Sequence, residues 1–144
     1  MKITETGNYD ELVPVFVSSG LEMNHEGDCP AEMITCWKAE DENGKPVGGV
    51  TIENRKGYYI IGDIAVKEEL RHKSIATELM KVAMKRLEDM KVGEIYLVAK
   101  APKFFETLGF YYLKPEETPE IFNCKTCKQR GIKCFPEFMK YDYR

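Results

Sequence analysis

The sequence lacks several features that would place it in a large protein class at once. No apolar run approaches the roughly 20 residues that a helix needs to span a bilayer, and the opening MKITETGNYDELV is polar, unlike a signal peptide. Neither sign of charge dominates, since 21 Lys and Arg against 24 Asp and Glu give a formal net charge of −3. These absences predict a cytoplasmic location and no membrane partner. They also argue against nucleic acid as the main ligand, because such domains usually carry a basic face.

The signs of a disulfide framework are missing as well. The five cysteines are odd in number and no secretory signal accompanies them, which favours reduced thiols, metal ligands or core residues. Three of them, Cys124, Cys127 and Cys134, lie in CKTCKQRGIKC. A two-residue gap lets two thiolates reach one ion, so these three could hold a structural zinc if a distant fourth ligand completed the site. The competing interpretation is three ordinary thiols in a loop.

Length and composition suit one domain. The chain has 144 residues, 43% of them hydrophobic and 31% charged, with no repeat, linker or low-complexity tract. We therefore predict a single domain over 1–144 with a cysteine-containing tail over 115–144. No Gly-x-Gly-x-x-Gly motif opens a helix, which excludes a dinucleotide-binding enzyme of that type.

The first half of the chain is expected to form a strand, a helix and a meander. MKITET reads as an edge strand, and Asn8 can cap a helix with Leu12, Phe16 and Val17 on its inner side. Three antiparallel strands should follow, in residues 33–42, 45–54 and 57–66, the first two joined by a two-residue hairpin turn at Asn43-Gly44 and the last two by Arg55-Lys56.

The second half begins with the most regular helix. Apolar residues recur at helical spacing at Ile75, Leu79, Ala83, Leu87 and Met90, and Gly93 fits the position that ends the helix. A strand over 94–100, a helix ended by Gly109 and a strand over 110–115 follow, and FMKYDY near the end could pair as a further strand. This order predicts an α+β (mixed α/β) fold with a right-handed crossover.

A cationic turn, RHKS, joins the third meander strand to this helix without a glycine or proline. A helix N-terminus presents unpaired backbone N–H groups and a partial positive charge. Arg71 and Lys73 would add full charges, and the small Ser74 and Ala76 would let a ligand approach the backbone. The turn could therefore bind a phosphate or pyrophosphate. It could equally be a solvated helix start that Ser74 caps.

Two motifs resemble those of the GNAT superfamily of N-acetyltransferases. IAVKEELRHKSIATELM resembles the acetyl-CoA-binding segment, in which a strand ending Leu/Ile-x-Val leads into Arg/Gln-x-x-Gly-x-Gly/Ala at a helix start. APKFFETLGF is similar to the family's Ala-x-x-Phe-Tyr-x-x-x-Gly-Phe. The resemblance covers about residues 46–113 and implies a twisted, mixed, mostly antiparallel sheet flanked by helices. It also implies acetyl-CoA as co-substrate.

The resemblance assigns cofactor contacts residue by residue. The strand before the turn would splay from its neighbour and pair with the pantetheine arm, and the turn amides would take the pyrophosphate. The residues so assigned are Ile64, Ala65, Val66, Arg71, His72, Lys73, Ser74, Ile75, Ala76, Thr77 and Phe104. Val66 would also offer its amide to the developing oxyanion.

The chain departs from the family pattern at catalytic positions. Ser74 replaces the first glycine, which is tolerable if the backbone there is helical, and His72 stands where glycine is common. Phe105 replaces the tyrosine often cast as general acid and cannot give a proton. Ile60 appears where the family often has a glutamate.

Other residues must then handle the protons. Glu53 or Asp63 could serve as the base, as could His25, Glu26 or a water relay, and Tyr111 or Tyr112 could replace the missing acid.

The resemblance implies an acetyl-CoA-dependent N-acetyltransferase that acts on a primary amine of a small molecule, amino acid or peptide. The alternatives are a non-catalytic acyl-CoA-binding sensor and a nucleic-acid-binding zinc module. Exposed strand edges make a homodimer reasonable.

Overall fold

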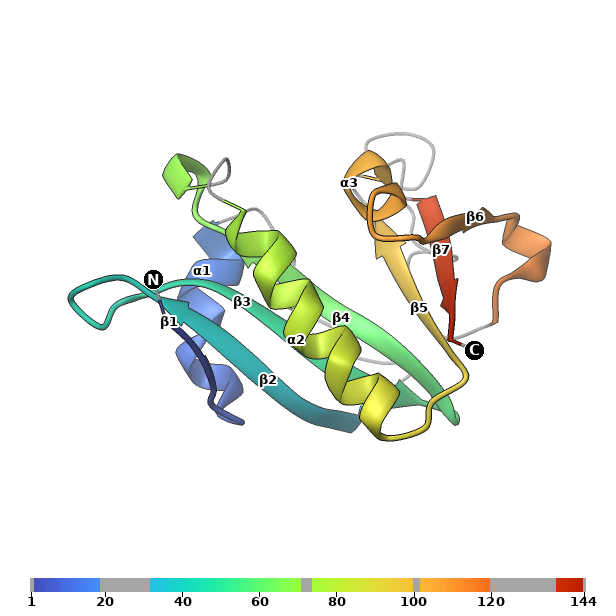
Figure 1. The fold of residues 1–144 in the computed structure, drawn as a ribbon, viewed down its shortest axis with the longest axis horizontal. Coiled ribbons are helices and arrows are strands. Elements are labelled where there is room, and N and C mark those ends of the chain that lie inside the picture. The colour runs from blue at the N-terminus through green and yellow to red at the C-terminus, as the bar shows by residue number, and fades with distance from the viewer. Residues whose placement is uncertain (1, 19–31, 71–73, 100–101, 120–136, 144) are drawn as a thin grey trace.

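The fold is a mixed sheet flanked by helices (Figure 1). The computed structural model describes residues 2–18, 32–70, 74–99, 102–119 and 137–143. In this part of the chain the strands are β1 (Lys2–Glu5), β2 (Glu32–Glu40), β3 (Pro46–Arg55), β4 (Tyr58–Val66), β5 (Glu94–Ala99), β6 (Tyr111–Leu113) and β7 (Glu137–Asp142). The helices are α1 (Val13–Ser18), α2 (Ile75–Asp89) and α3 (Pro102–Glu106), with 3₁₀ turns η1 (Tyr9–Glu11), η2 (Glu68–Leu70) and η3 (Pro115–Glu117).

The strand order is β1-β2-β3-β4-β5-β7-β6. Every neighbouring pair is antiparallel except β4 and β5, which α2 connects and which run parallel. The predicted α+β class, the edge strand, the meander and the crossover are thus confirmed. The late segment FMKYDY does form a strand, β7, and it lies between β5 and β6.

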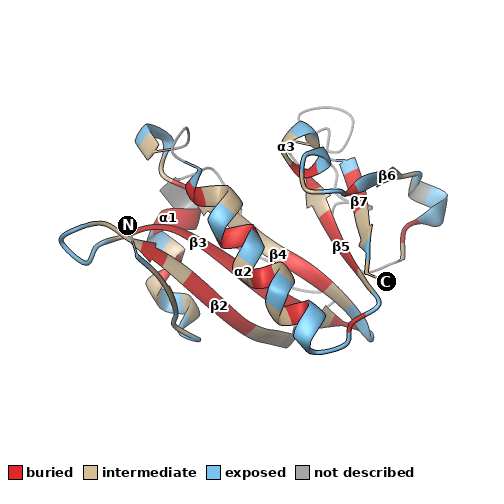
Figure 2. Ribbon diagram, viewed as in Figure 1, coloured by how far each residue is buried: buried red, intermediate tan, exposed pale blue. Residues whose placement is uncertain are grey.

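Helices cover both faces of the sheet. α2 packs on β2, β3 and β4 from one side and α1 packs on β3 and β4 from the other (Figure 1). The buried residues lie where the layers meet, on the central strands and on the inner side of α2 (Figure 2). The small Gly49 lets Leu12, beside α1, approach β3 closely. No helix in the described ranges is long and apolar enough to cross a membrane.

The meander turns differ from the predicted ones. Lys56 and Gly57 both have positive φ, 52° and 89°, and the flanking residues pair, so the two-residue turn is Lys56-Gly57. At Asn43-Gly44 only the glycine has positive φ, 76°. There the Asp41 carboxylate accepts the amides of Asn43 and Lys45, at 2.8 and 3.0 Å, which holds a longer loop. The prediction of a two-residue hairpin at Asn43-Gly44 was wrong.

The ends of α2 also depart from expectation. Ile75, Leu79, Ala83 and Leu87 are buried as predicted, but Met90 is 40% exposed and is the C-cap residue. Lys91 adopts the left-handed conformation that ends the helix, with φ of 66°, so the stop position is not Gly93.

Candidate functional site

The parallel strands β4 and β5 separate along their length. Among the described residues they pair at one register position, Ile60 with Tyr96, while β3 and β7 pair with their outer edges along most of their length (Figure 1). Within residues 61–66 of β4 and 97–99 of β5 the two facing edges form no further ladder. Ile64, Ala65 and Val66 lie on this diverging part of β4. A strand opened in this way can pair its backbone with an extended ligand.

The N-terminus of α2 follows soon after the open part of β4. The helix begins at Ile75, and its first hydrogen bond runs from the Glu78 amide to the Ser74 carbonyl, at 3.1 Å. The amides of Ile75, Ala76 and Thr77 therefore have no partner within the helix and point out of its end, where the dipole is positive. An anion placed there would complete their hydrogen bonds.

Ser74 has the left-handed conformation, with φ of 62° and ψ of 16°, and its side chain makes no capping hydrogen bond. The condition under which serine was expected to be tolerable here, a helical backbone, is therefore not met, and the side-chain cap expected of Ser74 as the alternative is not made. An L-residue with a Cβ pays for this conformation, and glycine does not. Position 74, where the family motif has a glycine, thus has a left-handed backbone that favours glycine, although the residue here is serine.

The remaining cofactor candidates divide by exposure. Ile75 is 4% exposed and packs in the core, so it can offer only its backbone amide to a ligand. Ala76 and Thr77 are half-buried beside it. Phe104 is half-buried against the edge of the Phe105 ring, with centroids 5.0 Å apart. Arg71, His72 and Lys73 lie outside the described residues.

A polar cluster lies on the α1 face of the sheet, beside the point where β4 and β5 separate. We call it the α1-face cluster, and its members are Tyr9, Thr51, Glu53, Arg55 and Asp63. Thr51, Glu53 and Arg55 alternate along β3 and are buried. The Thr51 hydroxyl donates to Glu53 Oε2 at 3.2 Å, and Arg55 Nη2 donates to Glu53 Oε1 at 3.2 Å. Both oxygens of this carboxylate are therefore held by neighbours on its own strand.

An irregularity in β4 brings Asp63 into the same cluster. Val50 pairs with Ile64 and Ile52 with Ile61, so two residues of β4, Gly62 and Asp63, oppose the single Thr51. The Asp63 amide donates to Thr51 Oγ1 at 2.9 Å. The structure thus connects both predicted base candidates, Glu53 and Asp63, through one threonine.

Tyr9 closes the cluster from η1. Its hydroxyl donates to Asp63 Oδ2 at 3.2 Å. Burial, followed by the negative charge of Asp63, raises the pKa of Tyr9 well above its ordinary value. Tyr9 therefore stays protonated at neutral pH and remains a hydrogen-bond donor.

Tyr111 stands apart from the two carboxylates. The register places Glu53, Ile60, Tyr96, Lys140 and Tyr111 in one row across β3, β4, β5, β7 and β6. With strands about 4.8 Å apart, four spacings separate Glu53 from Tyr111 by about 19 Å. The Tyr111 hydroxyl donates to Asp142 at 2.6 Å. Tyr111 and Glu53 therefore cannot both touch one reacting group in this arrangement.

The sequence matches the model of the Acetyltransferase (GNAT) family over residues 9–110, which is most of the chain. The chain belongs to the GNAT acetyltransferase family. It is accordingly an acyltransferase by family. No curated protein matched its sequence.

Solved structures share the GNAT fold at low sequence identity. A GNAT-family acetyltransferase from Staphylococcus aureus Mu50 superposes with a TM-score of 0.74 at 15% identity, covering 99% of each chain. The PaiA N-acetyltransferase from Thermoplasma acidophilum, in complex with coenzyme A, has a TM-score of 0.64 at 14% identity, covering 99% of this chain and 100% of that one. N-acetylglutamate synthase from Neisseria gonorrhoeae, with coenzyme A and N-acetyl-glutamate, has a TM-score of 0.72 at 11% identity, covering all of this chain but 36% of that one.

Two positions where this GNAT chain differs from the family pattern are part of its core. Phe105 is 6% exposed and packs edge-on to Phe110, with ring centroids 6.0 Å apart. Ile60 is 1% exposed and packs with Tyr96 and Leu113. Neither position offers a titratable group.

The described part of this GNAT domain does not include the three cysteines proposed as zinc ligands. Cys124, Cys127 and Cys134 lie outside the described residues, as do His25 and Glu26. Cys36 is fully buried beside Leu12 and Phe16, and burial raises the pKa of its thiol. Among the described residues no group of three His, Cys, Asp or Glu could hold a metal ion.

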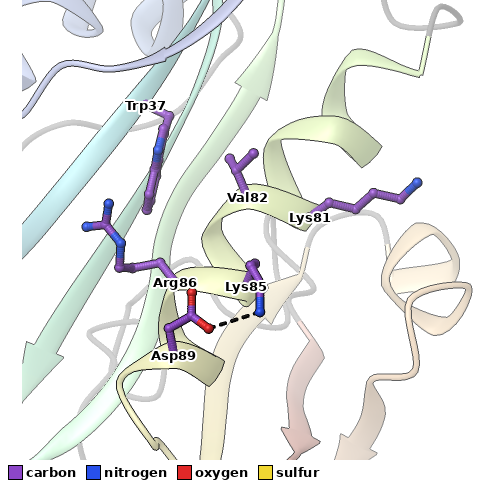
Figure 3. A pocket seen from close by; sticks show the side chains of 6 residues that line it. All are labelled: Trp37, Lys81, Val82, Lys85, Arg86 and Asp89. Atoms are coloured by element: carbon purple, nitrogen blue, oxygen red, sulfur yellow. Dashed lines mark hydrogen bonds and ion pairs between the residues drawn. The ribbon is translucent and has the colours of Figure 1, made fainter.

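A shallow depression of about 480 Å³ lies over α2 and β2 (Figure 3). Trp37 and Val82 line it together with three cations, each of which has an acidic partner. The pairs are Lys81 with Glu78, at 3.5 Å, Lys85 with Asp89, at 3.0 Å, and Arg86 with Glu5, at 2.6 Å. These charges are already neutralised, so the depression is not a strong anion site.

The sequence reading missed Tyr9, Thr51 and Arg55. For the two residues of β3 a signal was present, because Thr-x-Glu-x-Arg puts three polar side chains on one face of an otherwise apolar strand. Tyr9 gave no such signal, since its contact with Asp63 joins residues 54 positions apart.

Proposed function

We propose that this protein transfers the acetyl group of acetyl-CoA to a primary amine of a small molecule, amino acid or peptide. The observation that carries the proposal is the separation of β4 from β5 between the N-terminus of α2 and the α1-face cluster. The coenzyme A complexes of the Thermoplasma and Neisseria proteins support the choice of an acyl-CoA. The N-acetyl-glutamate in the latter supports a small-molecule acceptor.

The cofactor would lie along the open part of β4. Its pantetheine arm would pair with the backbone near Ile64 and Ala65, and its pyrophosphate would accept the amides of Ile75, Ala76 and Thr77. Arg71, His72 and Lys73 remain predicted contacts of the phosphates.

The reaction needs a neutral amine beside the thioester carbonyl. Glu53 takes a proton from the ammonium group, directly or through a water, and the amine nitrogen then attacks the carbonyl carbon. The C–N bond forms, the C–S bond breaks, and the departing thiolate of coenzyme A takes the second proton that the attacking nitrogen loses. Asp63, held by Tyr9, adds negative charge that favours a cationic acceptor. Correct placement of the two reactants supplies much of the acceleration.

Calorimetry with acetyl-CoA, followed by thiol release across an amine library, tests the proposal. Ala76→Glu should weaken acetyl-CoA binding about tenfold or more, because it puts a carboxylate where the pyrophosphate would bind. Ala76→Gln, of similar size and uncharged, is the matched control: it adds the same bulk without the charge, so it should weaken binding less than Ala76→Glu does. If neither calorimetry nor thiol release detects acetyl-CoA, the proposal is wrong.

A second candidate, a non-catalytic acyl-CoA-binding domain, is favoured by the buried Phe105 and Ile60. It predicts heat of binding without thiol release for any amine. A cytoplasmic location and a homodimer stay predictions of the sequence.

A further inference from the structure

In the α1-face cluster, the donor and the acceptor of both Thr51 hydrogen bonds can be assigned without ambiguity. Thr51 is fully buried in β3, and its oxygen lies 2.9 Å from the Asp63 amide and 3.2 Å from Glu53 Oε2. A backbone N–H can only donate, so the Thr51 oxygen accepts that bond. The single hydroxyl proton is then left for the carboxylate of Glu53.

The carboxylate that Thr51 holds lies against the open strand. A Cβ built on Gly62 of β4 would overlap the Glu53 carboxyl group and come within 2.7 Å of Thr51 Oγ1. Gly62 is two residues past the last pairing of β4 with β5 and two residues before Ile64. Two residues of strand span about 7 Å, so the carboxylate lies about that far along β4 from the backbone of Ile64, with which the proposed pantetheine arm would pair.

We infer that Thr51 is a positioning residue for acyl transfer: its hydroxyl connects the irregular part of β4 to Glu53 and fixes the orientation of that carboxylate beside the split. Arg55 holds the other oxygen, so the two neighbours together leave the group a single orientation. The inference rests on the proposed function with Glu53 as proton acceptor. The Thr51 hydroxyl contacts β4 through the Asp63 amide, and not through the backbone groups assigned to the ligand at Ile64, Ala65 and the N-terminus of α2. It should therefore affect turnover and not the binding of acetyl-CoA.

The chain provides a matched control for a test. Thr35, on β2, is also buried, at 6% exposure, and its hydroxyl donates to the carboxylate of Glu5 at 2.7 Å. It therefore makes the same type of hydrogen bond outside the α1-face cluster. Thr35→Val and Thr51→Val remove the same group from two buried threonines.

Steady-state kinetics on Thr51→Val, Thr51→Ser and Thr35→Val, with an amine that wild type acetylates, decide the matter. We expect Thr51→Val to lower kcat about tenfold or more with the KM for acetyl-CoA unchanged, because one charge-assisted hydrogen bond is lost. Thr51→Ser should recover kcat to within about threefold. Thr35→Val should keep the wild-type kcat, whatever its effect on stability.

Two results overturn the inference alone: a Thr51→Val enzyme as fast as Thr35→Val, or a Thr51→Ser enzyme as slow as Thr51→Val. A wild-type protein that binds acetyl-CoA but acetylates no amine overturns the proposed function and this inference with it. Thermal unfolding of each variant, with assays run well below the lowest midpoint, excludes loss of folded protein as the cause.

Discussion

At the scale of single residues, the backbone conformation of Ser74 is strained, and no capping hydrogen bond of its side chain compensates the strain. The left-handed region costs an L-residue about 1–2 kcal/mol, and Ser74 is exposed and makes no capping bond with its hydroxyl. The strained residue stands immediately before the first amides of α2.

Replacing Ser74 by glycine should stabilise the protein. Glycine removes the strain. Its larger conformational freedom stabilises the unfolded chain, which lowers the free energy of unfolding by about 0.4–1 kcal/mol. We expect a net gain of about 0.5 kcal/mol in the free energy of unfolding, measured by urea denaturation. Ser74→Ala is the control and should give no such gain, because alanine keeps a Cβ. A loss of stability in Ser74→Gly would mean that the serine hydroxyl matters.

At the scale of elements, one contact joins the N-terminal edge strand to the central helix. Glu5 of β1 accepts two hydrogen bonds from Arg86 of α2, at 2.6 and 3.1 Å, and a third from Thr35 of β2. The Arg86 guanidinium also lies over the Trp37 ring, 5.3 Å from its centroid (Figure 3). Chain segments 81 residues apart are thus held together beside the only tryptophan of the protein.

The Glu5–Arg86 contact should make stability depend on pH. The hydrogen bond from Arg86, and after it the one from Thr35, lowers the pKa of Glu5 in the folded protein. Its stabilisation is therefore complete above the unfolded pKa, near 4.5, and is lost as the pH falls through the lower folded value. Glu5→Gln should cost about 0.5–1 kcal/mol at pH 7, because both side chains are about 40% exposed.

Urea denaturation followed by Trp37 fluorescence at pH 7 and pH 3 measures this difference. The difference in the free energy of unfolding between wild type and Glu5→Gln should be smaller at pH 3 than at pH 7. Asp89→Asn removes the exposed ion pair with Lys85 and is the control for a general charge effect; it should change stability less. An equal gap at both pH values would contradict the assignment.

At the scale of the whole molecule, the split between β4 and β5 divides the sheet into two halves that meet at Ile60 and Tyr96. The row of residues through this pairing explains why Tyr111 and Glu53 belong to different halves. A ligand that pairs with β4 and reaches α2 would bridge the opened region and should stabilise the folded chain.

Acetyl-CoA at about 100 times its Kd should raise the free energy of unfolding by about 2.7 kcal/mol and the Tm by several degrees. Hydrogen exchange should slow in the open part of β4, residues 64–66, and at residues 75–77, since backbone amides there would bond to the ligand. Thermal scans and exchange mapped by mass spectrometry check both. Protection confined to other segments would place the cofactor elsewhere.

Much of the candidate site could be anticipated from local patterns, and the rest could not. The helix start at Ile75 and the strand end at Val66 follow from periodicity and from the family-like motif. Glu53 and Asp63 were named for their chemistry and not for a known distance. Their link through Thr51 depends on an irregularity in β4, which shifts the register without a mark in the sequence.

The sequence by itself determined the order of strands and helices, the buried side of α2 and the family, because these depend on interactions within a few residues or on a linear motif. Only the tertiary structure decided that β7 enters between β5 and β6, that the separation of β4 from β5 implied by the family motif begins after Ile60, and that Tyr9 reaches Asp63. Strand partners and side-chain clusters are chosen by the packing of the whole sheet. That choice depends on residues far apart in the chain, and no local pattern contains it.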